Sequence, residues 1–416
     1  MTIATLRMLA AATLVLLLQS AVAQDTFTIY WNNNHVYDAY QEVIDDFAAD
    51  HGVEVDLQTF AWPDMRTKLL TDFSAGQGPD LLEVPATWIT EFAGLGALRD
   101  VTDDIAAWDE SSDWFEGTWT EVTLDARRYG LKLHHTALAL FYNEDLFEEA
   151  GLDPTDPPET MAEFYATAEA LDAALGPDVA AFGFDTDPGY VMPFFASEET
   201  PFLIEDGEIA IDTPTIRETL QTLQDVSANG WALRPEPGAA YQATRRSFFE
   251  QRVAMILSGP WDIANLESLE SDFDYGISPV PRVDGAGALS TVAGTAVAIP
   301  DDAEHPDLAW DLMQRLTSVD VEVAATLETG MMMPRASWAA DPRLEGVPGV
   351  AEFTPILGAA SPFDIAARNL GLGDITPGGD VFEQLYQTVV YARGDVDDAL
   401  DAYVRESNRL IERASD

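Results

Sequence analysis

The first hundred residues alternate between short apolar segments and amphipathic segments, and this order most constrains the fold. Strands are predicted at residues 27–31, 53–57 and 81–84, and helices between them at 36–49 and 63–73. Strands separated by single helices pair in parallel through right-handed crossovers. The sequence therefore predicts an α/β fold with a doubly wound sheet flanked by helices.

A second region, at residues 248–261, predicts a buried strand that ends at a turn. Residues 253–257 form a continuous apolar run, which is typical of a strand covered on both faces, and Gly259 and Pro260 end it. Trp261 follows at the carboxyl end, where α/β sheets bind ligands. Trp261 is thus a candidate stacking platform, and the alternative is a structural tryptophan beside a hinge.

The amino terminus carries the pattern of a secretory signal. Arg7 precedes an apolar run at residues 8–18, and Ala21, Val22 and Ala23 form a small-x-small cleavage sequence. The chain has no cysteine, which excludes disulfides, thiolate metal sites and thiol nucleophiles. We expect removal of residues 1–23 and a periplasmic mature protein.

The net charge is −52, from 73 acidic residues against 21 basic ones. Such a chain repels nucleic acid. It also repels itself at low ionic strength, whereas at molar salt the Debye length falls to about 3 Å. The composition predicts a halophilic, salt-adapted protein, and the alternative is an acidic secreted protein without a salt requirement.

Roughly 390 residues remain after the signal, which is too many for one core and predicts two lobes. Four segments resemble, in this order, the sugar-binding solute-binding proteins of ABC importers, a maltose-binding-protein-like family. They are residues 78–82 (Gly-Pro-Asp-Leu-Leu), 140–152, 248–261 and 292–300.

The resemblance implies a class II periplasmic-binding-protein fold with a ligand cleft at the hinge. It places residues 24–137 and 281–333 in the N-terminal lobe, and 138–280 and 334–416 in the C-terminal lobe. It also implies a monomer that closes on a mono- or oligosaccharide and delivers it to ABC permease subunits. No cofactor and no catalytic residue is expected.

Sugars need aromatic platforms and planar polar groups. Trp62 and Trp88 lie at strand-to-helix loops, each with core packing as the alternative. Asp80 precedes the third strand. The resemblance implies that its carboxylate either accepts hydrogen bonds from ligand hydroxyls or stabilises the loop. The polar loop at residues 31–35 is a further candidate. Asn34 there is the default helix cap, and Asn34 and His35 are the ligand candidates together with the two preceding asparagines.

Three later residues complete the candidates. His134 lies before the first lobe crossing, and Gly294 would let backbone approach the sugar, with a plain turn glycine as the alternative. Arg335 would bind a hydroxyl pair or an anion, unless it pairs with a nearby carboxylate. We expect no metal site, because neither HExxH nor His-x-His occurs among the five histidines.

Two other functions remain open. The ligand could instead be a polyol, a glycosylated osmolyte or a glycerol phosphodiester. A secreted carbohydrate-active enzyme is the rival class, but accidental carboxylate pairs are unavoidable among 73 acids, so such pairs carry no information.

Overall fold

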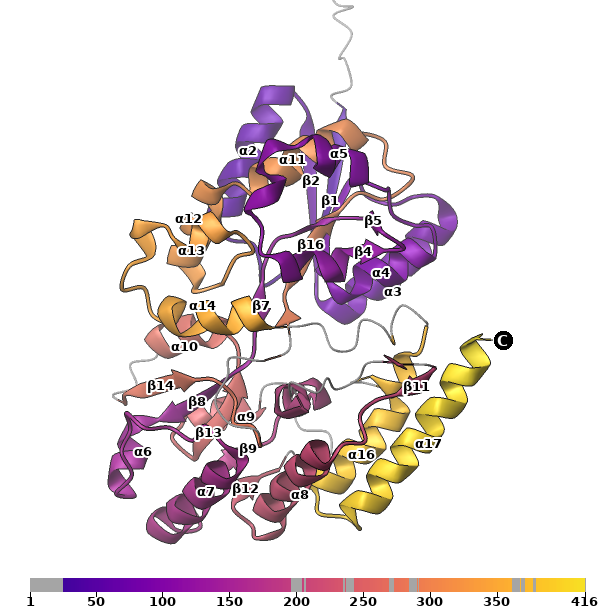
Figure 1. Cartoon of the computed structure of the whole chain (residues 1–416). Coiled ribbons are helices and arrows are strands. Elements are labelled where there is room, and N and C mark those ends of the chain that lie inside the picture. Colours follow the sequence, from indigo (N-terminus) through magenta and orange to yellow (C-terminus); the bar gives the residue numbers. More distant parts are fainter. Residues whose placement is uncertain are drawn as a thin grey trace, which may run out of the picture.

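The chain folds into two lobes, each built on a sheet covered by helices, in this computed structural model (Figure 1). The structure describes residues 25–195, 204–205, 207–234, 236, 243–268, 273–283, 290, 292–360, 367, 371–376 and 379–415. The predicted signal segment lies outside these residues. The predicted α/β class, with two sheets flanked by helices, is confirmed.

The first sheet has the strand order β2-β1-β3-β16-β6. Its strands are β1 (Thr26–Asn32), β2 (Glu54–Phe60), β3 (Leu81–Pro85), β6 (Leu131–Lys132) and β16 (Thr295–Ala298). β1 pairs in parallel with β2 and β3, as the alternation predicts, whereas β16 returns from the second lobe and pairs antiparallel to β3.

Two helices of the first lobe match the amphipathic segments predicted at residues 36–49 and 63–73. α2 (Asp38–His51) ends at Gly52, which adopts the left-handed conformation with φ 67°. The second is α3 (Trp62–Ala75), and the lobe also contains α4 (Thr87–Gly94), α5 (Thr102–Ala107), η1 (Asp109–Asp113), η2 (Glu116–Val122), α11 (Pro306–Leu316) and α12 (Val319–Thr329). Along the chain, α12 is followed by α13 (Ala336–Ala339) and η4 (Pro342–Leu344). α13 and η4 both contact α12.

The second sheet has the order β12-β9-β13-β8-β14. Its strands are β8 (Ala139–Asn143), β9 (Ala180–Gly183), β12 (Ala232–Leu233), β13 (Val253–Ser258) and β14 (Tyr275–Ser278). All six residues of β13 are buried, because the strand is central in the sheet. This confirms the strand predicted there.

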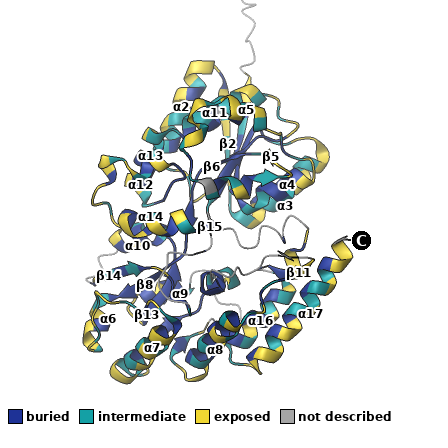
Figure 2. Ribbon diagram, viewed as in Figure 1, coloured by how far each residue is buried: buried dark blue, intermediate teal, exposed yellow. Residues whose placement is uncertain are grey.

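Helices of the second lobe and the segments around it are α6 (Glu144–Glu149), α7 (Met161–Leu175), η3 (Pro188–Phe195), α8 (Pro214–Ala228), α9 (Ala243–Phe249), α10 (Trp261–Ser268), α14 (Val350–Ala359), η5 (Gly373–Ile375), α16 (Asp380–Val390) and α17 (Val396–Ser415). α7 begins at a capping box between Thr160 and Glu163. Figure 2 shows buried residues along the sheets and exposed residues on the outer helix faces.

Short strand pairs complete the fold. They are β7 (Thr136–Ala137) with β15 (Val292–Ala293), β4 (Thr123–Leu124) with β5 (Arg127–Arg128), and β10 (Ile204–Glu205) with β11 (Glu208–Ile209). β7 lies between the two lobes in Figure 1, which places this stretch at a crossing. The lobe boundaries themselves stay a prediction. None of the described helices combines the length and the apolar character that a membrane span needs.

Candidate ligand-binding site

Four of the predicted residues come together on the first lobe: His35, Trp62, Trp88 and His134. The ring of His35 lies 5.6 Å from that of Trp62 and 4.9 Å from that of His134, and the two tryptophans are 6.1 Å apart. His35, Trp62 and Trp88 follow β1, β2 and β3 respectively. The carboxyl ends of parallel strands share one edge of a sheet, which explains the grouping.

This aromatic group is partly open to solvent. Trp62 and Trp88 are half-buried, and they meet edge to face rather than stacking. The Arg66 guanidinium lies 5.9 Å from the Trp88 ring, so it restrains that side chain. Half-buried indoles beside an imidazole supply both the apolar faces and the polar contacts that a sugar ring requires.

His134 lies behind this group and is fully buried. Its Nε2 is 2.9 Å from the Tyr40 hydroxyl, and its Nδ1 is 2.9 Å from the Thr295 hydroxyl. Burial holds the pKa of His134 well below its usual range, so the ring is neutral. Its place favours support of His35 over direct ligand contact.

Gly294 packs against the backbone of the same segment. Its φ is +118°, and a Cβ there would lie 2.1 Å from the His134 carbonyl oxygen. Gly294 separates β15 from β16. A glycine is therefore required here because two backbone segments approach closely. Its role is more than that of a plain turn glycine.

The predicted helix cap at Asn34 is wrong. α2 begins after Tyr37, and its first two backbone N–H groups, of Asp38 and Ala39, donate to the Glu328 carboxylate at 2.9 and 3.2 Å. The backbone N–H of Asn34 instead donates to Oδ1 of Asn32 at 2.8 Å, a local turn that competes with capping. Asn34 is exposed, so it stays a candidate for ligand contact.

Asp80 lies at the opposite edge of the first sheet, because it precedes β3 while His35 follows β1. Its carboxylate accepts hydrogen bonds from the backbone N–H groups of Thr28 and His305, each at 2.8 Å. Only 5% of Asp80 is exposed. This placement favours the loop-stabilising role over ligand contact.

Arg335 is 1% exposed and lies between the rings of Trp108 and Trp114, at 5.0 and 5.3 Å. Its Nε donates to the Thr317 carbonyl at 2.7 Å. Carboxylates of Glu110, Asp113 and Glu322 lie within 3.6 Å of the guanidinium. The arrangement favours the ion-pair alternative for this arginine.

Trp261 is the first residue of α10 and is half-buried. Its ring folds back over Gly259, where an added Cβ would lie 2.4 Å from the indole. Its neighbour Asp262 is fully buried and pairs with Arg245 at 2.8 Å. The start of α10 is thus held by the Asp262–Arg245 pair, and Arg245 lines a pocket of the second lobe.

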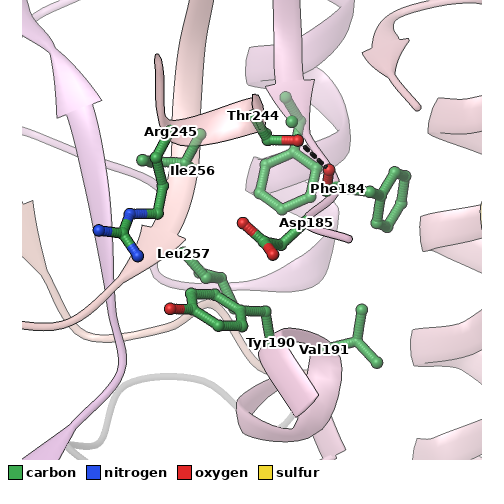
Figure 3. A pocket seen from close by; sticks show the side chains of 10 residues that line it. Phe184, Asp185, Tyr190, Val191, Thr244, Arg245, Ile256 and Leu257 are labelled. Carbon is green, nitrogen blue, oxygen red and sulfur yellow. Dashed lines mark hydrogen bonds between the residues drawn. The ribbon is translucent and has the colours of Figure 1, made fainter. Parts of the chain in front are cut away.

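That pocket contains residues that sequence reasoning missed. Figure 3 shows Asp185, Tyr190 and Arg245 directing polar groups into it, with Leu257 and other apolar residues as its walls. Thr244 donates to the Phe184 carbonyl at 2.6 Å and fixes one side. Asp185 closely follows β9 at its carboxyl end, so the rule that singled out Trp261 could have found it.

Asp185 is 5% exposed, and burial raises the pKa of its carboxyl group. Its Oδ1 accepts a hydrogen bond from the backbone N–H of Asp187 at 3.0 Å. Oδ2 has no hydrogen bond to any residue in the described part of the chain. A carboxylate held in a pocket with an open acceptor can bind a ligand hydroxyl.

One metal-competent group occurs within the described residues. The ligating atoms of His35, Glu83 and His134 lie within 4.8 Å of one another. The expectation of no metal site overlooked this group, because its members come from distant segments. Both nitrogens of His134 already face hydroxyl groups, so a metal would have to displace one of them.

Comparisons with known proteins agree with this architecture. A sequence model of the bacterial extracellular solute-binding protein family matches residues 31–323. A Brucella abortus (strain 2308) protein whose name says only that it is a binding protein is 23% identical over 390 residues, which is 90% of each chain. The arabinooligosaccharide-binding protein of Bacillus subtilis (strain 168) is 21% identical, over 71% of this chain and 70% of its own length.

A solved structure shows the same fold. An ABC transporter solute-binding protein from Thermotoga lettingae, bound with α-D-tagatose, superposes with a TM-score of 0.76 at 24% identity. The match covers 93% of this chain and all of that one.

Proposed function

The chain belongs to the bacterial extracellular solute-binding protein family, and from that premise we propose that it captures a mono- or oligosaccharide for an ABC-type importer. The observation that carries this proposal is the grouping of His35, Trp62 and Trp88 at the carboxyl edge of the first sheet. Sugar-binding names among the relatives support it.

Capture follows from the two lobes. The first lobe offers indole and imidazole groups, and the second offers Trp261 and the pocket around Asp185. Contacts from both lobes to one ligand exist only when the lobes close. Ligand therefore shifts the population toward the closed state, and no covalent step is required.

Several finer points belong to the same proposal. The mature protein is periplasmic, begins near Gln24, acts as a monomer and hands its ligand to permease subunits. The lobes divide at residues 137/138, 280/281 and 333/334. Family and fold are those of substrate-binding proteins, so enzymatic activity is not expected.

A thermal-shift screen tests the function. Mature protein in molar salt is mixed with saccharides, polyols, glycosylated osmolytes and glycerol phosphodiesters, and each ligand is analysed afterwards. Saturation at 100 times Kd should add about 2.7 kcal/mol of stability. Stabilisation by a saccharide that is recovered intact supports the proposal. Hydrolysis products would establish an enzyme instead. Stabilisation by phosphodiesters alone would show that the ligand is a phosphodiester and not a saccharide.

Asp185→Asn should raise the melting temperature at pH 7.5 while weakening saccharide binding. Because the folded-state pKa of Asp185 is raised, its ionised form destabilises the fold above that pKa, and the penalty disappears as pH falls through it. The amide keeps the hydrogen bond from Asp187 but loses the charge. Loss of a charge-assisted hydrogen bond should weaken binding about 10- to 100-fold.

Melting curves between pH 4 and 8 check this prediction, with calorimetry on the ligand found in the screen. Asp187→Asn is the comparison variant: its side chain is exposed and accepts a bond from the N–H of Gly189, and because its charge contributes only part of the rise in the Asp185 pKa, its melting temperature should change less. An Asp185→Asn protein that melts lower at pH 7.5, or binds as tightly as the wild type, contradicts the pocket assignment.

The melting temperature of the wild type should rise by several degrees between 0.1 and 2 M KCl. Because the net charge is −52, the acidic side chains repel one another at low salt. At molar salt the Debye length of about 3 Å screens most of that repulsion. Differential scanning calorimetry measures the change. A melting temperature that stays constant or falls with salt would rule out salt adaptation.

A further inference from the structure

Glu83 is a fully buried carboxylate in β3, and hydrogen bonds engage both of its oxygens. Oε1 lies 2.6 Å from Nδ1 of His35, and Oε2 accepts from the backbone N–H of Asn32 at 3.0 Å. Both contacts tie the loop after β1 to the neighbouring strand. The buried Glu83 carboxylate, with both oxygens bonded to this loop, therefore positions the loop.

The ring of His35 is held on several sides. Trp62 and Tyr37 pack against it at 5.6 and 5.7 Å, and His134 lies perpendicular to it at 4.9 Å. Its side chain remains 15% exposed. Nε2 has no hydrogen bond to any residue that the structure describes, so it is the ring atom left for a ligand.

The bond to Glu83 determines what Nε2 can do. Because Oε1 of Glu83 lies 2.6 Å from Nδ1, this contact favours the tautomer in which Nδ1 donates to the carboxyl oxygen and Nε2 presents its lone pair to a ligand. His134 behind it is neutral and bonded to Tyr40 and Thr295. The buried ammonium group of Lys132, two residues before His134 in the sequence, is paired with Glu121.

We propose that Glu83 is a positioning residue that fixes His35 as a hydrogen-bond acceptor for a ligand hydroxyl. The carboxylate charge directly behind the imidazole disfavours an anionic group at this point. The first lobe therefore selects a neutral, hydroxyl-bearing end of the ligand. This inference rests on the proposed function and deepens it, because it excludes a phosphate or carboxylate beside His35.

Nitrogen-15 NMR of histidine-labelled mature protein tests the proposal without any ligand. His35 is assigned with His35→Gln among five histidines. Wild type and Glu83→Gln should show the Nδ1–H tautomer at pH 7.5, because the amide oxygen can still accept. Glu83→Leu should lose it. Glu121→Gln is the matched control, a buried first-lobe carboxylate bonded to Lys132, and it should leave the His35 signals unchanged.

Binding supplies the second readout. Maltotriose, arabinobiose, tagatose and sn-glycerol 3-phosphate are the probes, and Glu83→Leu should bind the best neutral probe at least tenfold more weakly than Glu83→Gln does. An Nε2–H tautomer or an imidazolium in the wild type overturns the proposal. So does micromolar Zn²⁺ binding that is lost in His134→Gln, since the group would then be a metal site.

Preference for sn-glycerol 3-phosphate over every neutral probe overturns it as well. Failure of all saccharides to bind would count against the proposed function, whereas the tautomer is read on the free protein and decides the Glu83 role by itself. Circular dichroism at each step verifies that the variants are folded.

Discussion

Arg335→Met should lower the free energy of unfolding by about 3–5 kcal/mol, the cost of removing one partner from a buried ion pair. The guanidinium is 1% exposed, and Glu322 beside it is equally buried. Burial already raises the pKa of Glu322, and Arg335 is the one cause that opposes this rise. Methionine would leave that carboxyl group and the Thr317 carbonyl without their partner.

Urea unfolding measures this change in the presence of molar salt. Arg343→Met is the control, because Arg343 is 47% exposed and its pairs with Asp320 and Asp341 lie at the surface, where the cost should stay below about 1 kcal/mol. Adding Glu322→Leu to Arg335→Met should restore part of the loss. If Arg335→Met left the stability unchanged but abolished ligand binding, Arg335 would instead be assigned to the ligand site.

Gly294→Ala should destabilise the protein by about 3 kcal/mol or more. The φ of +118° is unfavourable for alanine, and the new Cβ would fall 2.1 Å from the carbonyl oxygen of His134. That contact is with backbone, so no side-chain rotation can relieve it. The carbonyl of Gly294 also accepts from the N–H of Ala86, which extends the disturbance to the loop before α4.

The matched control for this prediction is Gly358→Ala. Gly358 lies exposed in α14, and a Cβ there would meet nothing within 4 Å. Alanine should be neutral or stabilise that helix by up to about 1 kcal/mol. If Gly294→Ala unfolds at the same urea concentration as the control, the close backbone approach at His134 is not required.

Local patterns predicted the elements well, because each depends on neighbours in the sequence. The alternation in the first lobe and the strand at residues 253–257 are examples. Capping failed at Asn34, where a hydrogen bond to Asn32 competes with the helix end. Asparagine can form either a helix cap or a local turn, so only the backbone geometry shows which of the two is present.

Long-range partners limited the prediction of the site. Placing Trp62, Trp88 and His35 together needed only the rule that parallel strands share an edge. The same rule, applied to the amino end of β3, would have moved Asp80 to the other edge. Glu83 was missed because an acid within an apolar strand shows no partner until His35 is positioned. The cage around Arg335 joins segments more than two hundred residues apart.

Small-angle X-ray scattering of the mature protein, with and without the saccharide that stabilises it in the screen, tests the central claim most directly. Closure of two lobes on a sugar predicts a smaller radius of gyration at saturation, an intact ligand and affinity near micromolar, about −8 kcal/mol. An unchanged radius of gyration at saturation would contradict capture by lobe closure.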